Sequence, residues 1–587
     1  MNYVEGCSES ELEEWLMIPP TKEMGDFSLP CFQLAKRMHL SPKMIAEEIK
    51  EGIEEEANQK SKVKEVSEES SEEQQEFLER VEVVNGYLNF YLKESWYVNW
   101  LFKQSISNVT EDICEGTGKT VCIDYSSPNI AKNFHIGHLR TTIIGNSLYK
   151  IYQKLGYHVV GINHLGDWGT QFGKLIVAYM KWGTKEQVEK EGIDELLRLY
   201  VLFHEKVEEV PELIQEARLW FLKMEEKDPE ALELWQWFKD ISMIEFQKIY
   251  DLLQITFDSY SGESVYTDQV AGVVERLREK QLLLESEGAN VVLLEEENLP
   301  ACLITKSDGT SIYPSRDIAA VFHRKETYDF CKCLYVTGTE QQLHFNQVFQ
   351  VIRKMGYEWW EDLVHIPYGL VSIQGEKLSS RTGTMVFAKD LLAEAITRAL
   401  AIMKEKNPSL MRKEEIAKQV GIGAVIFHEL YNVRIKNVSF SWEQVLNFDG
   451  ATGPYIQYTY ARANRMIQKN GGKEMLQWFE EKKTYEIEQE KLMEFCQYYT
   501  EEVSKTILDL LASYHQTIKE AAMRYEPCVI ARFAYHLAQT FNQFYQECNI
   551  QNAEPECKQA RLFLACLAHQ TIKDAMALLG IECPEEM

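Results

Sequence analysis

Two histidines that flank an isoleucine and a glycine are the side chains whose spacing most clearly suggests chemistry. They are His135 and His138, with Gly137 between them, in the run DYSSPNIAKNFHIGHLRTTIIGNSLYKIY. The run passes from an apolar strand through a polar turn into a helix, so the histidines fall at a helix N-terminus. Such an end offers unpaired N–H groups and a positive dipole to an anion, and glycine lets a flat ring approach the backbone. The pattern predicts a nucleotide site with phosphates on the histidines and adenine over Gly137, although two surface histidines on a capped helix fit it equally.

The segments around this turn indicate an α/β domain that must position it. TVCIDYSS precedes the turn and has the composition of a buried parallel strand. YHVVGINHLG follows it, then a helix-rich stretch from about residue 186 to residue 254, then the strand-like runs NVVLLEE, ACLITK, CLYVTGT and VHIPYGLV. Strands spaced by helical crossovers predict a Rossmann-like parallel sheet with helical insertions and with ligands at the carboxyl ends of its strands.

Two other regions flank this domain. Residues 1–115 mix short strand-like runs such as VEVVNGYLNFYL with amphipathic helical segments, which predicts a small α+β domain. The turn sequence GTGK opens the α/β domain, expected over 116–450. From Tyr455 onward the apolar residues follow a helical period, which predicts an all-α bundle over 451–587. We therefore expect a multidomain α/β protein of three parts.

Composition bounds the classes of function. A net charge of −29 over 587 residues argues against nonspecific binding to nucleic acid, so any such contact must use local basic patches. The thirteen cysteines are scattered without a CxxC pair, and Cys331 and Cys333 read as alternate positions of a strand. We expect free thiols and neither zinc nor another structural metal. The acidic N-terminus and the lack of a membrane-length apolar run predict a cytoplasmic protein without a membrane partner.

The HIGH run after the first strand of an α/β domain resembles the ATP-binding element of class I aminoacyl-tRNA synthetases. These enzymes carry a second element, KMSKS, far downstream, and here Gly375 to Gly383 reads GEKLSSRTG. Lys377 and Ser379 match that element. Ser380 stands where the family has a lysine that neutralises charge on the pyrophosphate leaving group. The resemblance implies ATP contacts from Lys377, Ser379 and Ser380 besides the double-histidine turn.

Arginyl-tRNA synthetases commonly show this departure, and a lysine just before HIGH is thought to substitute for the missing one. In SSPNIAKNFHIGH that residue is Lys132. Displacement at a phosphorus atom is catalysed mainly by positioning and charge stabilisation, so a cation can come from either loop if it reaches the same oxygens. The resemblance therefore makes Lys132 a catalytic candidate with His135, His138 and Lys377. Without that context Lys132 reads as a solvated turn lysine.

The resemblance to the arginine enzymes continues through NHLGDWGTQFG at 163–173, where Trp168 is expected to pack beneath the site. Binding a guanidinium requires a carboxylate, because the group is planar, permanently charged and best met by a bidentate anion. SIYPSRDIAAVFHR resembles the family helix whose Tyr and Asp contact that group, here Tyr313 and Asp317 at i and i+4. Glu263 in SGESVY is a second candidate carboxylate. Unaided, Asp317 also fits an ordinary helix salt bridge.

Three more residues correspond to the family's contacts with the amino-acid backbone. They are Asn129 and Asp124 near the first strand and Gln341 in VTGTEQQLHF. An α-ammonium needs acceptors and an α-carboxylate needs donors, which these side chains supply between them. Asp124 fits a loop cap as well, and His344 fits a packed histidine at a strand end.

Contacts with tRNA are implied at both ends of the chain. EMGDFSLPCFQLAK and NGYLNFYL resemble the N-terminal domain with which arginyl-tRNA synthetases contact the tRNA elbow, and NFDGATGPYIQYTYARANRM with the closing helices resembles their anticodon-binding bundle. Tyr455 and Tyr458, interleaved with Arg462 and Arg465, suit stacking on splayed bases and binding of phosphate. The tyrosine spacing also fits a buried helix face.

The resemblance implies a monomeric arginine–tRNA ligase. Its substrates would be L-arginine, ATP with Mg²⁺ and the tRNA for arginine, without a tightly bound cofactor. Two alternatives remain at this stage. One is a class I synthetase for another amino acid, such as glutamine or glutamate. The other is a catalytically silent paralogue that binds tRNA, which the serine at Ser380 favours.

Overall fold

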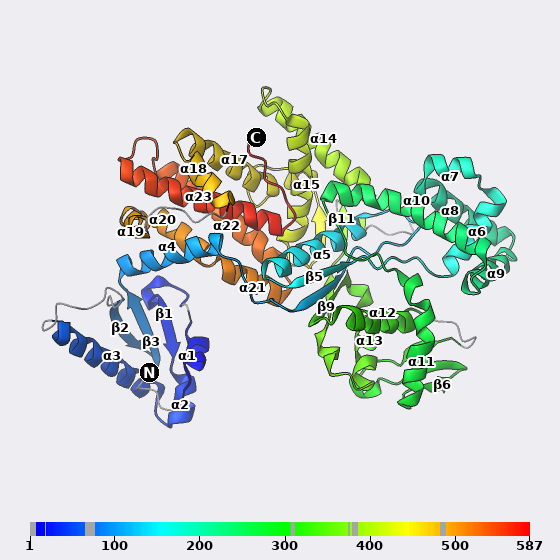
Figure 1. The fold of residues 1–587 in the computed structure, drawn as a ribbon, viewed down its shortest axis with the longest axis horizontal. Helices are drawn as coiled ribbons and strands as arrows, with labels where there is room; N and C mark the ends of the chain where they lie inside the picture. The colour runs from blue at the N-terminus through cyan, green and yellow to red at the C-terminus, as the bar shows by residue number, and fades with distance from the viewer. Residues whose placement is uncertain are drawn as a thin grey trace. The chain divides into compact units, whose positions relative to one another are not determined.

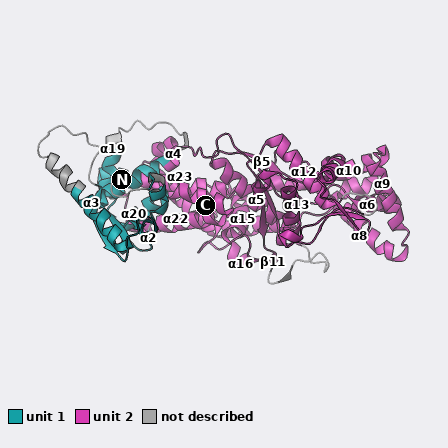
Figure 2. Ribbon diagram, turned by 90° about the horizontal axis from the view of Figure 1, so that it is seen from below, with its two compact units in different colours: residues 1–107, 484–512, 552–561 teal, residues 108–483, 513–551, 562–587 magenta. Residues whose placement is uncertain are grey.

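The structure is a computed structural model that describes residues 7–17, 19–64, 77–306, 312–373, 376–377, 386–481 and 489–587. The chain divides into two compact units, coloured separately in Figure 2, and we describe each by itself. Unit 1 comprises residues 1–107, 484–512 and 552–561, and unit 2 comprises residues 108–483, 513–551 and 562–587. Within the described residues, no helix has both the length and the apolar character needed to span a membrane.

Unit 1 contains an antiparallel sheet of order β1-β3-β2 (Figure 1). VEVVNGYLNFYL supplies most of β2 and all of β3 and turns at Asn85 and Gly86, the dipeptide that favours a tight hairpin. The buried side chains of Leu34, Ile45 and Leu88 pack the helices on this sheet, which confirms the predicted α+β character. The elements of unit 1 are α1 (Glu9–Trp15), β1 (Phe27–Pro30), α2 (Phe32–Met38), α3 (Pro42–Lys64), β2 (Leu78–Val84), β3 (Tyr87–Leu92), α4 (Glu94–Thr110), α19 (Gln489–Glu494) and α20 (Glu502–Ala512).

The centre of unit 2 is a parallel four-stranded sheet of order β10-β9-β4-β5. The strands are β4 (Thr120–Asp124), β5 (His158–Ile162), β9 (Lys332–Gly338) and β10 (Leu363–Tyr368). Three helices connect or cover them: α5 (Ile136–Lys154), α12 (Tyr313–Tyr328) and α13 (Gln342–Lys354). The chain leaves β4 toward β5 on one side, whereas β9 pairs with β4 on the other. Strand order therefore reverses at β4, where an open parallel sheet binds its ligands.

The helix-rich stretch between β5 and the following strands forms a group of helices at one end of unit 2 (Figure 1). Trp168 is buried, as expected, but it packs among these helices and does not line the site: its ring meets Phe221 and Trp235 edge-on, with centroids 5.9 and 5.7 Å away. The helices are α6 (Thr170–Trp182), α7 (Lys185–Glu191), α8 (Ile193–Glu209), α9 (Leu213–Glu225) and α10 (Pro229–Leu253). The next helix, α11 (Val270–Glu279), packs against α12 instead.

The prediction that NVVLLEE and ACLITK join the parallel sheet is wrong. They form β7 (Ala289–Val292) and β8 (Cys302–Thr305), which pair antiparallel with β6 (Leu284–Ser286) in a separate sheet. The reason lies in the link between β6 and β7, which is only Glu287 and Gly288, both with positive φ (52° and 79°). A two-residue link closes a hairpin, whereas parallel strands need a crossover of a dozen residues or more.

The rest of unit 2 is mainly helical. A small sheet of order β12-β11-β13 contains β11 (Val371–Ile373), β12 (Glu376–Lys377) and β13 (Val438–Phe440). Among the described residues of 453–587 every regular element is a helix, which confirms the predicted terminal helices. The helices are α14 (Ala388–Lys406), α15 (Lys413–Tyr431), α16 (Trp442–Val445), α17 (Gly453–Lys469), α18 (Lys473–Glu481), α21 (Tyr514–Arg524), α22 (Cys528–Glu547) and α23 (Pro555–Leu578).

Candidate active site

A cavity of about 420 Å³ opens at the carboxyl edge of the parallel sheet, at the reversal of strand order. Its walls come from the turn after β4, the start of α5, the end of β9 and the connection from β10 to β11. Five predicted site residues line it: Asn129, His135, Gly137, His138 and Gln341. The lining residues not singled out from the sequence include Arg140, Thr337, Glu340 and Tyr368.

The two histidines cap the helix that they begin. His135 is the N-cap residue of α5, and its Nδ1 accepts hydrogen bonds from the backbone N–H groups of Gly137 (3.1 Å) and His138 (3.4 Å). In return, His138 Nδ1 accepts from the backbone N–H of His135 (3.4 Å), and the rings stack with centroids 3.7 Å apart. Because both Nδ1 atoms accept, the neutral rings carry their proton on Nε2. Each ring therefore has an Nε2–H group left to donate.

Burial lowers the pKa of His135, and the nearby charge of Lys132 lowers it further. The pKa of His138 lies well below its usual value, again because of burial first and then because of His135 and Lys132. Both rings are thus neutral hydrogen-bond donors at neutral pH, not cations. An added Cβ on Gly137 would stand 2.9 Å from His135 Cε1, so glycine is needed for this close arrangement.

Lys132 lies on the turn between β4 and α5 and is half-buried. Its Nζ is 6.0 Å from the ring centroid of Tyr200, from α8, and it borders a small space beside the main cavity rather than lining the cavity itself. No carboxylate in the described part of the chain forms an ion pair with Lys132. The ammonium therefore remains available to an anion that enters beside the histidines.

The downstream element is described only in part. Lys377 belongs to β12, where it is paired with Ser372 of β11, and its side chain lies outside the described residues. Ser379 and Ser380 also lie outside them. The predicted roles of these three residues stay predictions.

Asp317 is held between two histidines. His344 Nε2 donates to its Oδ2 at 2.5 Å, and His164 Nε2 lies 3.7 Å from its Oδ1. Burial alone would raise the pKa of Asp317, but the hydrogen bond and charge of His344, followed by His164 and Arg324, hold it below its usual value. Asp317 is therefore a carboxylate at neutral pH. His344 lies in the first turn of α13 and not at a strand end, so that alternative is wrong.

Glu263 faces the same helix from a neighbouring segment. It forms an ion pair with Arg316 of α12 at 3.2 Å, and its side chain is 12% exposed. Burial raises the pKa of Glu263 to about 8, against the opposing charge of Arg316. Tyr313 stands one turn before Asp317 and is 58% exposed, with the guanidinium carbon of Arg316 5.0 Å from its ring centroid. The Asp317 carboxylate, the acidic side chain of Glu263 and an accessible phenol thus surround the start of α12.

Asp124 ends β4, and its carboxylate is already engaged. Arg324 Nη2 donates to its Oδ2 at 2.7 Å, and Ser127 Oγ donates to its Oδ1 at 2.8 Å. Asn129 pairs with Gly166 of the turn after β5, and Gln341 ends the short helix after β9. Asn129 and Gln341 therefore reach the cavity from the segments that follow β4 and β9, whereas Asp124 holds Ser127 of the turn after β4.

The partners of these acidic side chains are the residues that the sequence analysis does not identify. Arg316, Arg324 and His164 each face a predicted acidic residue. A buried carboxylate needs such a partner, but the requirement does not say which residue provides it. Among the described residues, no group of three or more His, Cys, Asp and Glu side chains is arranged to hold a metal ion. All thirteen cysteines lie among the described residues, outside any disulfide.

The candidate tRNA-contact residues lie on α17 and differ in exposure. Tyr458 is 40% exposed, with the guanidinium carbon of Arg462 4.9 Å from its ring centroid. Arg465 is exposed, whereas Tyr455 is half-buried and its hydroxyl accepts from Asn542 Nδ2 at 3.0 Å. The alternative of a buried helix face therefore does not hold for Tyr458. An exposed aromatic ring stacked with arginine is suited to bind an unstacked base.

The parallel sheet, with a neutral double-histidine turn after its first strand, defines the catalytic domain of a class I aminoacyl-tRNA synthetase. Residues 103–442 match the family described as tRNA synthetases class I (R), catalytic domain. Residues 456–587 match the DALR anticodon binding domain, and residues 4–68 match the arginyl tRNA synthetase N terminal domain. The chain therefore belongs to the arginyl-tRNA synthetase family.

Individual relatives agree with this assignment. The arginine–tRNA ligase of Alkaliphilus metalliredigens is 44% identical over 100% of this chain and 97% of its own length. That of Clostridium botulinum strain 657 is 46% identical over 98% and 96%. The arginyl-tRNA synthetase structure from Thermus thermophilus superposes with a TM-score of 0.77 at 23% identity, covering 97% of this chain and 96% of that one. The structural likeness supports the fold, and the sequence relatives support the family.

Proposed function

We propose that this chain activates L-arginine with ATP and transfers the arginyl group to the terminal adenosine of the tRNA for arginine. The observation that carries the proposal is a neutral double-histidine donor pair on the cavity at the sheet's carboxyl edge, with Asp317 and Glu263 at the start of α12. The first part fits a triphosphate, and the second fits a guanidinium.

The Nε2–H groups of His135 and His138 would donate to phosphate oxygens of Mg–ATP, which is the substrate form. Because both rings stay neutral, they orient the phosphates without adding charge. The charge that develops on the leaving pyrophosphate would be met by Lys132 from the preceding turn, with Lys377, Ser379 and Ser380 as further contacts. A cation from the turn before the histidines is needed because Ser380 replaces the usual lysine of the downstream element GEKLSSRTG.

The reaction has two steps. An oxygen of the arginine carboxylate attacks the α-phosphorus, and the bond from that phosphorus to pyrophosphate breaks, which yields arginyl-adenylate. A hydroxyl of the terminal tRNA adenosine then attacks the arginyl carbonyl carbon, and AMP leaves. Positioning and electrostatic stabilisation are the main contributions that a protein can make to such displacements.

Selection of arginine would depend on Asp317 and Glu263 as guanidinium acceptors with Tyr313 beside them. Asn129, Gln341 and Asp124 would bind the α-ammonium and α-carboxylate groups of the amino acid. An amino acid without the guanidinium would make no charge-assisted hydrogen bonds to Asp317 and Glu263, and a site built around such bonds discriminates strongly against a ligand that lacks them. Glutamine and glutamate are therefore poor substrates in this proposal.

Recognition of tRNA would use Tyr455, Tyr458, Arg462 and Arg465 on α17, together with the N-terminal region over 1–115. We also propose that the protein acts as a monomer in the cytoplasm. Thirteen cysteines that lie outside any disulfide support a reducing compartment. The residues 116–450 and 451–587 would be the catalytic and anticodon-binding parts.

Aminoacylation of total tRNA with radiolabelled arginine, glutamine and glutamate in parallel tests this function. We expect charging with arginine alone and release of AMP and pyrophosphate. Charging with glutamine or glutamate would contradict the assignment of the pocket. Retention of tRNA on the protein without any charging would identify a silent binding protein instead.

A further inference from the structure

One wall of the cavity rests on a turn from a distant part of the chain. The wall is residues 368–371, all of which line the cavity, and the turn is residues 434–438, which we call the backing turn. Wall and turn are joined by three hydrogen bonds: Gly369 N to Arg434 O (2.9 Å), Leu370 N to Asn437 Oδ1 (2.8 Å) and Val438 N to Leu370 O (2.9 Å).

The backbones of the wall and of the backing turn are closely packed. A Cβ added to Gly369 would lie 2.6 Å from both the carbonyl carbon and the carbonyl oxygen of Lys436. The backbones are therefore as close as a glycine allows, and interiors this dense transmit displacement. A shift of the backing turn would move the wall of the cavity.

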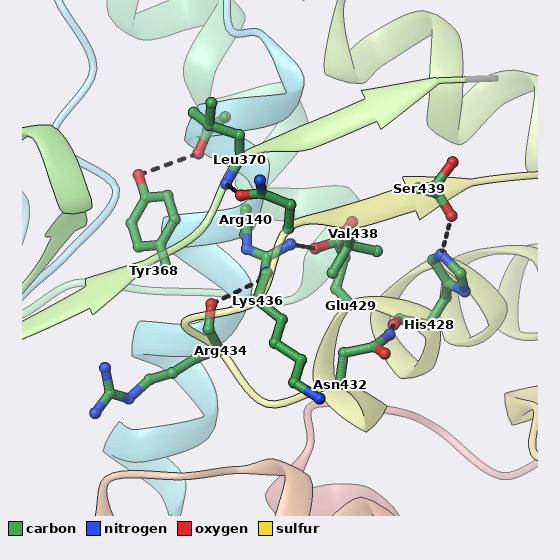
Figure 3. Close-up of polar contacts among 12 residues, drawn as sticks. Arg140, Tyr368, Leu370, His428, Glu429, Asn432, Arg434, Lys436, Val438 and Ser439 are labelled. Atoms are coloured by element: carbon green, nitrogen blue, oxygen red, sulfur yellow. Dashed lines mark hydrogen bonds and ion pairs between the residues drawn. The ribbon is translucent and has the colours of Figure 1, made fainter. Parts of the chain in front are cut away.

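The backing turn is held by Arg140 from α5, as Figure 3 shows. Arg140 is 1% exposed, and its Nη2 donates to the carbonyl oxygens of Arg434 and Lys436 at 3.0 Å each. Its Nη1 donates to Glu429 Oε2 at 3.1 Å, so the two charges neutralise each other. Arg140 stands two residues after His138 on the same helix. The Arg140 guanidinium therefore links α5, the helix that begins at the two histidines, to the backing turn that supports the cavity wall.

Arg140 lines the cavity but is not placed to act on a phosphate. Both terminal nitrogens are committed to protein acceptors, and the charge is matched by a carboxylate that is itself 2% exposed. Burying such a pair costs desolvation that the attraction between the charges does not always recover, so its value is often specificity of arrangement rather than stability. In this protein, the arrangement that the pair would specify is the distance between two parts of the cavity lining: the histidines His135 and His138, and the wall 368–371.

We propose that Arg140 is a positioning residue for the ATP step: with Glu429, it sets the backing turn and therefore the wall 368–371 relative to His135 and His138. This inference rests on the proposed function, because it assigns ATP to the cavity. Loss of the Arg140 side chain should misplace the wall and weaken the use of ATP. The substrate arginine has its backbone at Asn129 and Gln341 in the same cavity, but its guanidinium contacts at the start of α12 are kept, so its KM should change far less.

The test is a double variant, Arg140→Met with Glu429→Leu, assayed by arginine-dependent exchange of pyrophosphate into ATP in the presence of tRNA. Removing both charges avoids stranding one of them, so we expect a thermal midpoint close to that of the wild type. We expect the KM for ATP to rise at least about tenfold, as the loss of two hydrogen bonds to the turn implies. The KM for arginine should stay within about twofold, a split that general destabilisation would not produce.

The matched control is Lys154→Met with Asp574→Asn. It removes an ion pair of 2.9 Å at the opposite end of α5, and it should leave the KM for ATP unchanged. If the Arg140 double variant does not fold, Arg140→Lys is assayed in its place. Lysine keeps a positive charge opposite Glu429 but cannot donate to Glu429 and to the backing turn from two separate nitrogens. That variant should show the same selective rise.

An unchanged KM for ATP in the folded variants would overturn the proposal. So would equal rises for ATP and arginine, or a rise in the control as large as that in the Arg140 variant. Failure of the wild type to exchange pyrophosphate with arginine would refute the proposed function instead. A normal wild type with normal variants would refute only the positioning role.

Discussion

The binding of arginine should tighten as the pH rises from about pH 7 to about pH 8.5. Glu263 is the group responsible, because burial raises its pKa to about 8 in the free protein despite Arg316 at 3.2 Å. A guanidinium binds the carboxylate and not the neutral acid. Below the pKa most molecules must therefore lose the Glu263 proton before they bind arginine.

The size of the effect follows from the fraction of Glu263 that is ionised. With the pKa at about 8, roughly a tenth of the molecules carry the carboxylate at pH 7 and roughly three quarters at pH 8.5. The apparent Kd scales inversely with the competent fraction, so it should fall about eightfold across this range. About one proton should leave per arginine bound at pH 7.

Isothermal titration with arginine across this pH range measures both quantities. Titrations at pH 7 in two buffers with different ionisation enthalpies give the number of protons released. Glu263→Gln is the control, since an amide does not titrate: it should bind weakly with a Kd that hardly changes with pH. A wild-type Kd that is flat from pH 7 to 8.5, without proton release, would refute this account of Glu263.

Three further outcomes follow from the site. Asp317→Asn should raise the KM for arginine about a hundredfold with little change for ATP, because a partly buried carboxylate partner of the guanidinium is lost; steady-state exchange kinetics check it. His135→Ala should lower kcat for exchange about tenfold or more and also lower the thermal midpoint, because its Nδ1 accepts the N–H groups of the second and third residues of α5. Tyr458→Ala should raise the KM for tRNA about tenfold in aminoacylation and leave exchange at saturating tRNA near normal, because stacking on one base is lost. Equal effects of Tyr458→Ala on both assays would contradict its assignment to tRNA.

The parts of the fold that sequence reasoning found are those with local signals. The turn from β4 into α5 was readable because the strand, the polar turn and the helical period are contiguous. The terminal helices were readable from their periodicity. The sequence does not predict the pairing of β7 and β8, because an apolar run does not indicate which strand it pairs with. The hairpin signal, Glu287 followed by Gly288, is weak.

The site divides in the same way. His135, Gly137 and His138 form one local motif, and the structure assembles them with Asn129 and Gln341 around one cavity. The ion pairs of Asp317, Glu263 and Asp124 join segments that are far apart in the chain. The spacing of residues along the sequence therefore cannot predict them. The pairing of Arg140 with Glu429 spans 289 residues and was invisible for the same reason.

The central claim is that Lys132 supplies the charge that Ser380 does not. The most direct measurement is the single-turnover rate of arginyl-adenylate formation, with tRNA present, for wild type, Lys132→Met and Lys132→Arg. We predict that Lys132→Met lowers this rate at least about a hundredfold with an unchanged KM for arginine, and that Lys132→Arg restores part of it. A rate for Lys132→Met within about twofold of the wild type would contradict the account.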